Sequence, residues 1–205
     1  MRHPRRLALA FASLTTLALL SPGLARSDDG PPPNPAIDMK GYLRVSLEAA
    51  AHRESRRLTE EQFLRMSAEP GVIVLDARSK ARYDELHVKG AINLSFPDIA
   101  IVSLAQTLPD KNATILIYCN NNFLNNTPVT ERALASKRLT ASLNLSTYIA
   151  LYTYGYRNIY ELGPQLDIRT TKLEFEGTLA AERDRDVQNR PEGKALAVQQ
   201  DAELR

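Results

Sequence analysis

The stretch GVIVLDARSKARYDELHVKGAINLSF, residues 71–96, contains a strand–helix–strand pattern. Its first part, Val72 to Leu75, is a continuous apolar and β-branched run, which is typical of a parallel strand buried on both faces. Asp76-Ala77-Arg78 follows this strand, and a short helix is predicted over 80–86 before a second strand at Ala91 to Leu94. The stretch therefore predicts a parallel βαβ unit.

The same alternation extends in both directions from this unit. Thr59 is suited to cap a helix that runs to about Met66, because its hydroxyl can accept a hydrogen bond from the first turn. Further helices are predicted at 98–108 and 140–154, and further strands at 115–118 and 158–162. We expect an α/β fold, a doubly wound parallel sheet with helices on both faces and right-handed crossovers.

The first 25 residues are predicted to be a secretory signal peptide. Arginines at positions 2, 5 and 6 precede the apolar run Leu7 to Leu20, and Gly23 and Ala25 place small side chains where a signal peptidase reads them. A retained membrane anchor is the alternative, but the apolar run is short for spanning a bilayer. The protein is therefore expected in the periplasm or outside the cell, without stable membrane insertion.

Composition divides the remaining chain into four parts. Residues 26–38 contain acids, Gly and several prolines and are predicted to be a linker, and residues 39–57 are predicted to form an extra helix. The main domain is expected over 58–168. Residues 169–205 turn polar and charged, so we predict a disordered tail.

Charge and cysteine content exclude several classes of function. Removing the leader takes away three basic residues and leaves a net charge of about −1, and no basic patch is interleaved with aromatic residues. Nucleic acid is therefore not an expected partner. Cys119 is the single cysteine and cannot form an internal disulfide, and only His52 and His87 remain after leader removal. We expect no structural metal and no cofactor.

Cys119 follows the predicted strand 115–118, and the polar loop Asn120 to Asn126 comes directly after it. The carboxyl ends of parallel strands line the crevice in which such sheets bind ligands. A functional thiol is therefore favoured over the alternative, a cysteine that acts as a small buried hydrophobe. The asparagines are either turn residues or neutral hydrogen-bond donors to a substrate.

The order of these elements resembles the rhodanese-like domain over roughly residues 58–168. The resemblance rests on Asp76-Ala77-Arg78 after one strand, on the block RYDELHVKGAINLSF at 82–96, on Cys119 after the next strand, and on GYRNIYEL at 155–162. It implies a cysteine that carries a persulfide in a loop whose backbone N–H groups point at the sulfur. By this resemblance the catalytic residue is Cys119, and the expected substrate-binding residues are Asn120, Asn121, Asn122, Phe123, Asn125 and Arg78.

Some residues of the site keep two interpretations. Arg78 either faces the substrate or holds the loop through an ion pair with Asp76, and the second role is favoured. The loop 120–126 contains no Arg or Lys. Because thiosulfate is a dianion, this loop offers no cation to bind it, which argues against thiosulfate as the donor. An apparent insert at 127–139 carries Arg132, Lys137 and Arg138, which either fold over the site or form a solvated surface. A reshaped or covered mouth of the site is expected.

Three functions remain in competition. The leading hypothesis is a periplasmic sulfurtransferase that takes a sulfane sulfur from a small donor onto Cys119 and passes it to a thiol or to cyanide, with a periplasmic protein as a further candidate partner. The second is a catalytically silent binding module. A cysteine phosphatase or arsenate reductase is disfavoured, because position 125 is Asn where those loops place an arginine.

Overall fold

The computed structural model describes residues 32, 34–124 and 127–189. The chain divides into two compact units, residues 1–37 and residues 38–205. The predicted leader lies outside the described residues, and so does most of the predicted linker. Within the described part of the chain, no helix is both long and apolar enough to cross a membrane. The second unit contains the predicted α/β domain.

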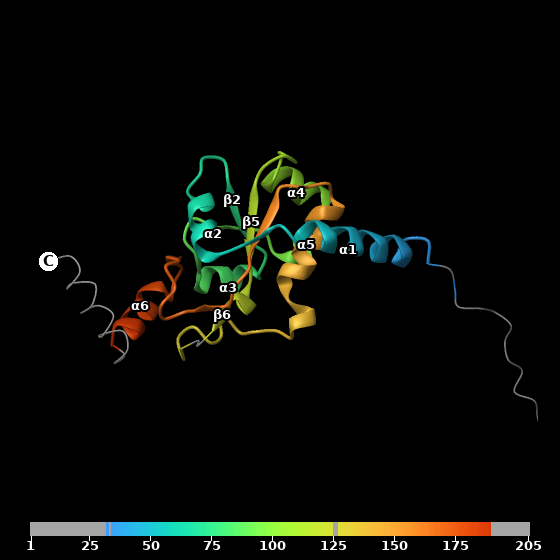
Figure 1. Cartoon of the computed structure of the whole chain (residues 1–205). Helices are drawn as coiled ribbons and strands as arrows, with labels where there is room; N and C mark the ends of the chain where they lie inside the picture. Colours follow the sequence, from blue (N-terminus) through green and yellow to red (C-terminus); the bar gives the residue numbers. More distant parts are fainter. Residues whose placement is uncertain (1–31, 33, 125–126, 190–205) are drawn as a thin grey trace, which may run out of the picture. The chain divides into compact units, whose positions relative to one another are not determined.

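The second unit is built on a parallel sheet (Figure 1), which confirms the predicted fold class. Its five strands run in the order β1-β7-β5-β2-β4, and every neighbouring pair is parallel. Their bounds are Arg57–Leu58 for β1, Ile73–Asp76 for β2, Ile92–Asn93 for β4, Ile115–Tyr118 for β5 and Ile159–Leu162 for β7. The carboxyl ends of β2 and β5 therefore lie side by side.

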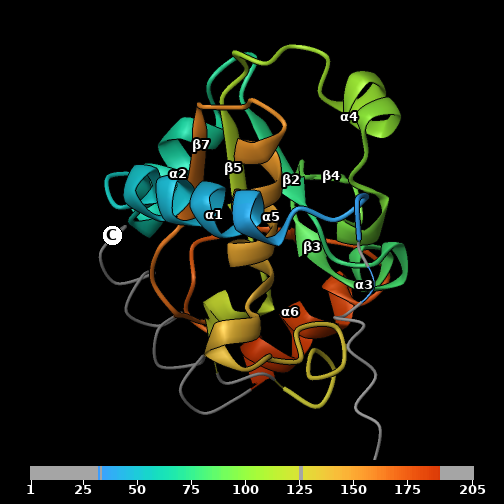
Figure 2. The same cartoon turned by 90° about the vertical axis from the view of Figure 1, so that its right-hand side faces the viewer.

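Helices cover both faces of the sheet. Successive side chains of the central strand β5 point to opposite faces, so each face contributes to its own core cluster. Leu116 and Tyr118 of β5 belong to the core cluster shared with α2 (Glu60–Ser67) and the region of α3 (Lys80–Glu85). Ile115 and Ile117 belong to the cluster shared with α1 (Met39–Arg53), α4 (Ile101–Thr107) and α5 (Leu143–Thr153). Figure 2 shows α1 and α5 on this second face.

Two element ends follow from local chemistry. Thr59 caps α2, with its hydroxyl accepting from the backbone N–H of Gln62 while the Gln62 side chain accepts from the backbone N–H of Thr59. Gly155 follows α5 with a φ of +94°, a backbone conformation that favours glycine. The strand at β5 also has its predicted bounds.

The extra N-terminal helix is shorter than predicted. It ends at Arg53, whereas the sequence predicted helix as far as Arg57. Arg57 and Leu58 instead extend as β1 and pair with Glu161 and Leu162 of β7. The burial of the Leu58 side chain explains the difference, because an edge strand places this side chain in the core. The helical periodicity of the sequence does not reveal that burial.

The insert predicted at 127–139 is packed onto the domain. Thr127, Thr130, Ala133 and Leu134 are buried, and the last two belong to the core cluster on the face of α2. The segment forms hydrogen-bonded turns and ends in the 3₁₀ helix η3 (Leu139–Ala141). All of the predicted insert is described, and it is an integral part of the fold.

The prediction of a disordered tail from residue 169 is wrong for the part that the structure describes. Short strands add two small sheets, in which β9 (Phe175–Glu176) pairs with β3 (His87–Val88) and β8 (Leu166–Asp167) pairs with β6 (Phe123–Leu124). The helix α6 spans Ala180–Asn189. Leu173 is buried, and the Phe175 ring packs edge-on against Phe123 at 5.5 Å, so a few apolar residues order a polar segment. Residues 190–205 lie outside the described residues.

Candidate active site

Cys119 leaves the central strand β5 at the edge of the sheet where parallel strands end. Tyr118, the last residue of β5, is in register with Asp76, the last residue of β2, and Asp76 is in register with Asn93 of β4. Residues that follow these strands therefore meet at one edge. This is the position in which open α/β sheets bind ligands.

The thiol of Cys119 is almost completely enclosed, since the residue is only 1% exposed. Its sulfur lies 3.5 Å from the hydroxyl oxygen of Ser142, which precedes α5. The backbone N–H of Cys119 donates to Oδ1 of Asn122 at 2.9 Å. A substrate can reach the sulfur only through the cavity beside it or after the surrounding residues move.

The loop after Cys119 forms a tight 3₁₀ turn, η2 (Asn120–Asn122). The backbone N–H of Asn122 donates to the carbonyl of Cys119 at 3.0 Å, and that of Phe123 donates to the carbonyl of Asn120. The loop thus uses these two N–H groups itself. The resemblance implies that loop amides point at the sulfur; the hydrogen bonds of these two N–H groups run to carbonyl oxygens.

Three asparagine side chains hold this loop in place. The Asn120 amide donates to the carbonyl of Ala135. Asn121 donates to the carbonyl of Lys137 at 2.9 Å and accepts from its N–H at 2.8 Å. These two asparagines therefore fasten the insert to the cysteine loop.

Asn122 fastens the loop to the region after β7. Its Nδ2 donates to the carbonyls of Leu162 at 2.8 Å and Pro164 at 3.1 Å, and its Oδ1 also accepts from the Asn144 amide at 3.3 Å. Asn125 lies outside the described residues. The three described asparagines of the loop thus donate to acceptors within the protein and hold its framework. Turn propensity alone does not predict this role.

A small cavity of about 180 Å³ opens beside Cys119. Besides the cysteine, its lining includes Asn121, Asn122 and Ser142, all from segments discussed above. Two charged residues complete it, Arg53 at the end of α1 and Glu161 in β7. Neither residue is predicted to belong to the site from the sequence, because both lie far from Cys119 in the chain.

Arg53 and Glu161 form an ion pair in the wall of this cavity. The guanidinium Nη2 of Arg53 lies 2.5 Å from Oε1 of Glu161, whose side chain is almost fully buried. The other oxygen, Oε2, is buried and has no hydrogen-bond partner among the described residues. Burial raises the pKa of the Glu161 carboxyl above its ordinary value, although Arg53 works against that rise.

Arg78 serves the framework of the site. It is 4% exposed, and its guanidinium binds the carboxylate of Asp76 through Nε at 3.0 Å and Nη2 at 2.6 Å. It also donates to the carbonyls of Ala133 at 2.9 Å and Leu86 at 2.6 Å. These contacts join the end of β2, the end of α3 and the insert.

The Tyr118 hydroxyl completes the buried network around Asp76. It donates to Oδ2 of Asp76 at 2.5 Å and accepts from the backbone N–H of Val88 at 3.0 Å. Burial, followed by the Asp76 charge, raises the pKa of the Tyr118 phenol well above its ordinary value, so the phenol remains a donor. The network fixes the two strand ends beneath Cys119.

A second and larger cavity, of about 810 Å³, lies on the other side of the cysteine loop. Asn120 lines it together with Arg132 and Lys137 of the insert, and with Lys80 and Arg82 of α3. Arg132 is paired with Glu85 of α3. Arg132 and Lys137 of the insert thus line the larger cavity. Neither of them lines the cavity of Cys119.

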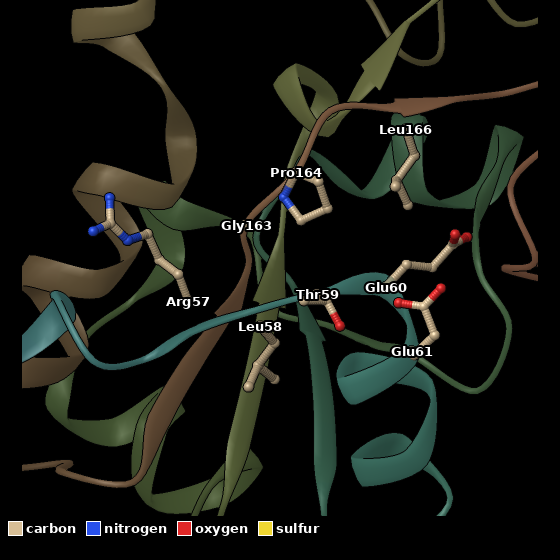
Figure 3. Close-up of a pocket in the computed structure, with 8 residues that line it drawn as sticks. All are labelled: Arg57, Leu58, Thr59, Glu60, Glu61, Gly163, Pro164 and Leu166. Atoms are coloured by element: carbon tan, nitrogen blue, oxygen red, sulfur yellow. The ribbon is translucent and has the colours of Figure 1, made fainter.

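Figure 3 shows a third hollow, of about 550 Å³, between β1, the start of α2 and the turn after β7. Glu60 and Glu61 stand on one side of it, and Arg57 points away. Glu60 accepts hydrogen bonds from Thr171 at 2.5 Å and from the backbone of Lys172 at 2.7 Å. Its carboxylate already serves to hold the C-terminal segment, so this hollow is not the candidate active site.

The parallel sheet with a cysteine after its central strand defines an α/β protein with a thiol in the ligand crevice of the sheet. The model of the rhodanese-like domain family matches residues 59–162, half of the chain, and the protein belongs to this family. The matched segment begins after Arg53, so the helix that carries this cation lies outside it.

Individual relatives match only in part. Thiosulfate sulfurtransferase PspE of Escherichia coli K12 is 39% identical over 46 residues, which are 22% of this chain and 43% of that protein. The chain thus spans less than half the length of this curated relative. Among solved structures, BH2092 from Bacillus halodurans is 21% identical with a TM-score of 0.45, covering 75% of this chain and 98% of its own. Thiosulfate sulfurtransferase from Pseudomonas aeruginosa is 18% identical with a TM-score of 0.40, covering 71% and 27%.

Proposed function

We propose that the protein is a sulfurtransferase in which Cys119 carries the transferred sulfur as a persulfide. The observation that carries the proposal is the place of this cysteine, the single one of the chain, at the end of the central strand of a rhodanese-like domain and in the wall of a polar cavity. A thiol in this position is in the ligand crevice of the sheet. The protein would act on small sulfur compounds.

The reaction has two balanced halves. The Cys119 thiolate attacks the transferable sulfur of the donor and a sulfur–sulfur bond forms. The rest of the donor leaves with the electron pair of the bond that held this sulfur, a sulfur–sulfur bond in thiosulfate or polysulfide and a carbon–sulfur bond in a mercaptopyruvate-type donor. A thiol or cyanide then attacks the outer sulfur of the persulfide, and Cys119 leaves as thiolate. The cysteine ends in the state in which it began, and no external oxidant or reductant is needed.

The residues around the cysteine would divide between substrate contact and support. Asn121 and Asn122 line the cavity of Cys119 and would contact the substrate there, and the hydroxyl of Ser142 lies beside the sulfur. Asn120 lines the larger cavity on the other side of the loop. Phe123 is buried against Tyr118 and Phe175, which supports a packing role.

A periplasmic location is part of the proposal. Its support is the arrangement of residues 1–25, with basic residues before an apolar run and small residues at the expected cleavage point. Export would place the thiol in an oxidising compartment, where it has no second cysteine of its own chain to pair with. Cell fractionation combined with the N-terminal sequence of the mature protein tests this part.

A silent binding module is the second candidate, and the burial of Cys119 favours it. A cysteine that is 1% exposed is also what a structural thiol looks like. The two candidates differ in one observable property. Only the sulfurtransferase forms a persulfide at residue 119.

Intact-mass spectrometry separates the two functions. The mature protein is incubated with thiosulfate, with polysulfide or with a mercaptopyruvate-type donor, and Cys119→Ser is treated in parallel. Because the chain has one cysteine, any added sulfur that disappears in this variant belongs to residue 119. We expect the mass of one sulfur atom to be added, and cyanide to remove it. No adduct with any of these donors would leave the binding module as the function.

A further inference from the structure

Glu161 occupies a position where a buried strand normally has an apolar residue. It is 1% exposed and lies in β7 between β5 and β1. Ile159, two residues before it, belongs to the core cluster shared with α1 and α5, so the carboxylate points to the same face of the sheet. An ionised carboxylate in such a place needs compensating contacts.

Only one of the two carboxylate oxygens of Glu161 has such a contact. Oε1 is held by Arg53 at 2.5 Å, whereas Oε2 is buried without a hydrogen-bond donor among the described residues. Buried acceptors in native structures almost always have a donor, so an unpartnered one calls for a ligand that donates. Glu161 lines the same cavity as Cys119, which places this residue beside the thiol's substrate space.

The charge of the cavity argues for the kind of ligand. Arg53, the one cation among the described residues that line it, is already paired with Glu161, so these residues leave no surplus positive charge for a dianion. Arg132 and Lys137 line the other cavity. A compact molecule that donates a hydrogen through its sulfur matches both the free acceptor and the neutral charge, and a thiol is such a molecule.

We propose that Oε2 of Glu161 accepts the proton of the thiol that discharges the Cys119 persulfide. The step rests on the proposed sulfurtransferase function. The acceptor thiol gives its proton to Glu161, its sulfur attacks the outer sulfur of the persulfide, and a new sulfur–sulfur bond forms. The old sulfur–sulfur bond breaks, Cys119 leaves as thiolate, and the proton later passes from Glu161 to water.

The surroundings of Glu161 suit it to this task. Burial raises the pKa of its carboxyl, which makes the carboxylate a stronger base than an exposed one. Arg53 opposes that rise and fixes the orientation of the group through Oε1. The charged and titratable groups around it come from the end of α1 and the residue after it, from β1, from α5 and from the residue after β5: Arg53, Glu54, Arg57, Tyr148 and Cys119.

The test compares two acceptors on the same persulfide. Cys119 is first loaded with polysulfide, and its discharge is then followed by mass spectrometry with cysteine and, separately, with cyanide. The cyanide rate is taken per cyanide anion, because at pH 7 most cyanide is hydrogen cyanide, whose carbon carries a proton. The attacking carbon of the anion carries none, so this rate does not need the base. The ratio of the two discharge rates therefore isolates proton removal from any general loss of reactivity.

Glu161→Gln keeps the size of the side chain and an oxygen for Arg53 but removes the base. A thiol with a pKa of about 8.5 is only about 3% thiolate at pH 7, so a base can raise its reactive fraction up to about 30-fold. We expect the cysteine-to-cyanide ratio to fall about tenfold near pH 7 and to return to the wild-type value above about pH 9, where the thiol ionises unaided. Glu161→Asp, which keeps a carboxylate, should retain part of the ratio.

Glu174→Gln is the matched control, because Glu174 pairs with Lys89 at the surface and lies outside the cavity of Cys119. Its ratio should equal that of the wild type. A ratio that Glu161→Gln leaves unchanged or raises at pH 7 would overturn the proposal while the sulfurtransferase function stands. Failure of the wild type to load a persulfide would overturn both, and the two failures are distinct because loading is measured first.

Discussion

Replacing Asn122 with alanine removes four hydrogen bonds that hold the cysteine loop. The side chain accepts from the N–H of Cys119 and from Asn144, and donates to the carbonyls of Leu162 and Pro164. Asn122 is buried, so water does not simply replace these contacts. The substitution therefore tests whether this amide fixes the position of the thiol.

The structure allows the loss in stability to be worked out. The buried N–H of Cys119 loses its acceptor, which costs about 1 to 3 kcal/mol, and each of the other bonds contributes about 0.5 to 1.5 kcal/mol net. We expect the free energy of unfolding to fall by about 2.5 to 7.5 kcal/mol, which in a domain of this size lowers Tm by roughly 5 to 30 °C. Urea unfolding followed by circular dichroism measures the loss.

A surface asparagine provides the control for this substitution. The Asn158 amide donates to the carbonyl of Asn112 at 2.8 Å in an exposed hydrogen bond, and Asn158→Ala should cost no more than about 1 kcal/mol. In Asn122→Ala, persulfide loading at Cys119 should also slow. A loss in stability below about 1 kcal/mol, together with unchanged loading, would refute the role of this amide.

Two further perturbations act on other buried groups. Arg78→Leu leaves the fully buried carboxylate of Asp76 without its cation and should cost about 3 to 5 kcal/mol in urea unfolding, with recovery when Asp76→Asn is added. The second perturbation is acidification: burial, and then two neighbouring arginines, lower the pKa of His52 below its ordinary value. The stability that His52 contributes is thus present above about pH 6.5 and is lost as the pH falls through the lowered pKa. In His52→Gln, the urea concentration at the unfolding midpoint should therefore fall less between about pH 7 and pH 5 than it does in the wild type.

The central strands could be predicted because their signal is local. Residues 72–75 and 115–118 are short apolar runs, and a strand buried on both faces needs no more than this. Such runs also fix which residues end at the carboxyl edge, so the placement of Cys119 followed directly. The alternation of β5 between the two core clusters confirms that both faces are covered.

The parts that were missed depend on distant partners. The strand β1 has two residues, and its extended form depends on pairing with β7 rather than on its own propensity. The segment 169–189 is polar in composition, yet Leu173 and Phe175 anchor it to the core. Composition averages such residues away, whereas packing depends on where each one lies.

The charged pair beside Cys119 has one local sign in the sequence. Glu161 interrupts the strand IYEL, residues 159–162, at a position that is in register with the apolar Ile117 of β5 on one side and with Arg57 of β1 on the other. A carboxylate there requires a cation, a proton or a donor ligand, because burying an isolated charge is too costly. No residue of the loop 120–126 can supply the cation.

The cation comes instead from Arg53, on a helix that precedes the family segment. The helix α1 reaches the cavity because it packs on α5, whose preceding residue Ser142 lies against the sulfur. The cysteine loop thus has no cation of its own, and the end of α1 supplies one to the cavity. A site without Arg53 would hold a buried carboxylate next to a thiolate, and each negative charge would disfavour the other.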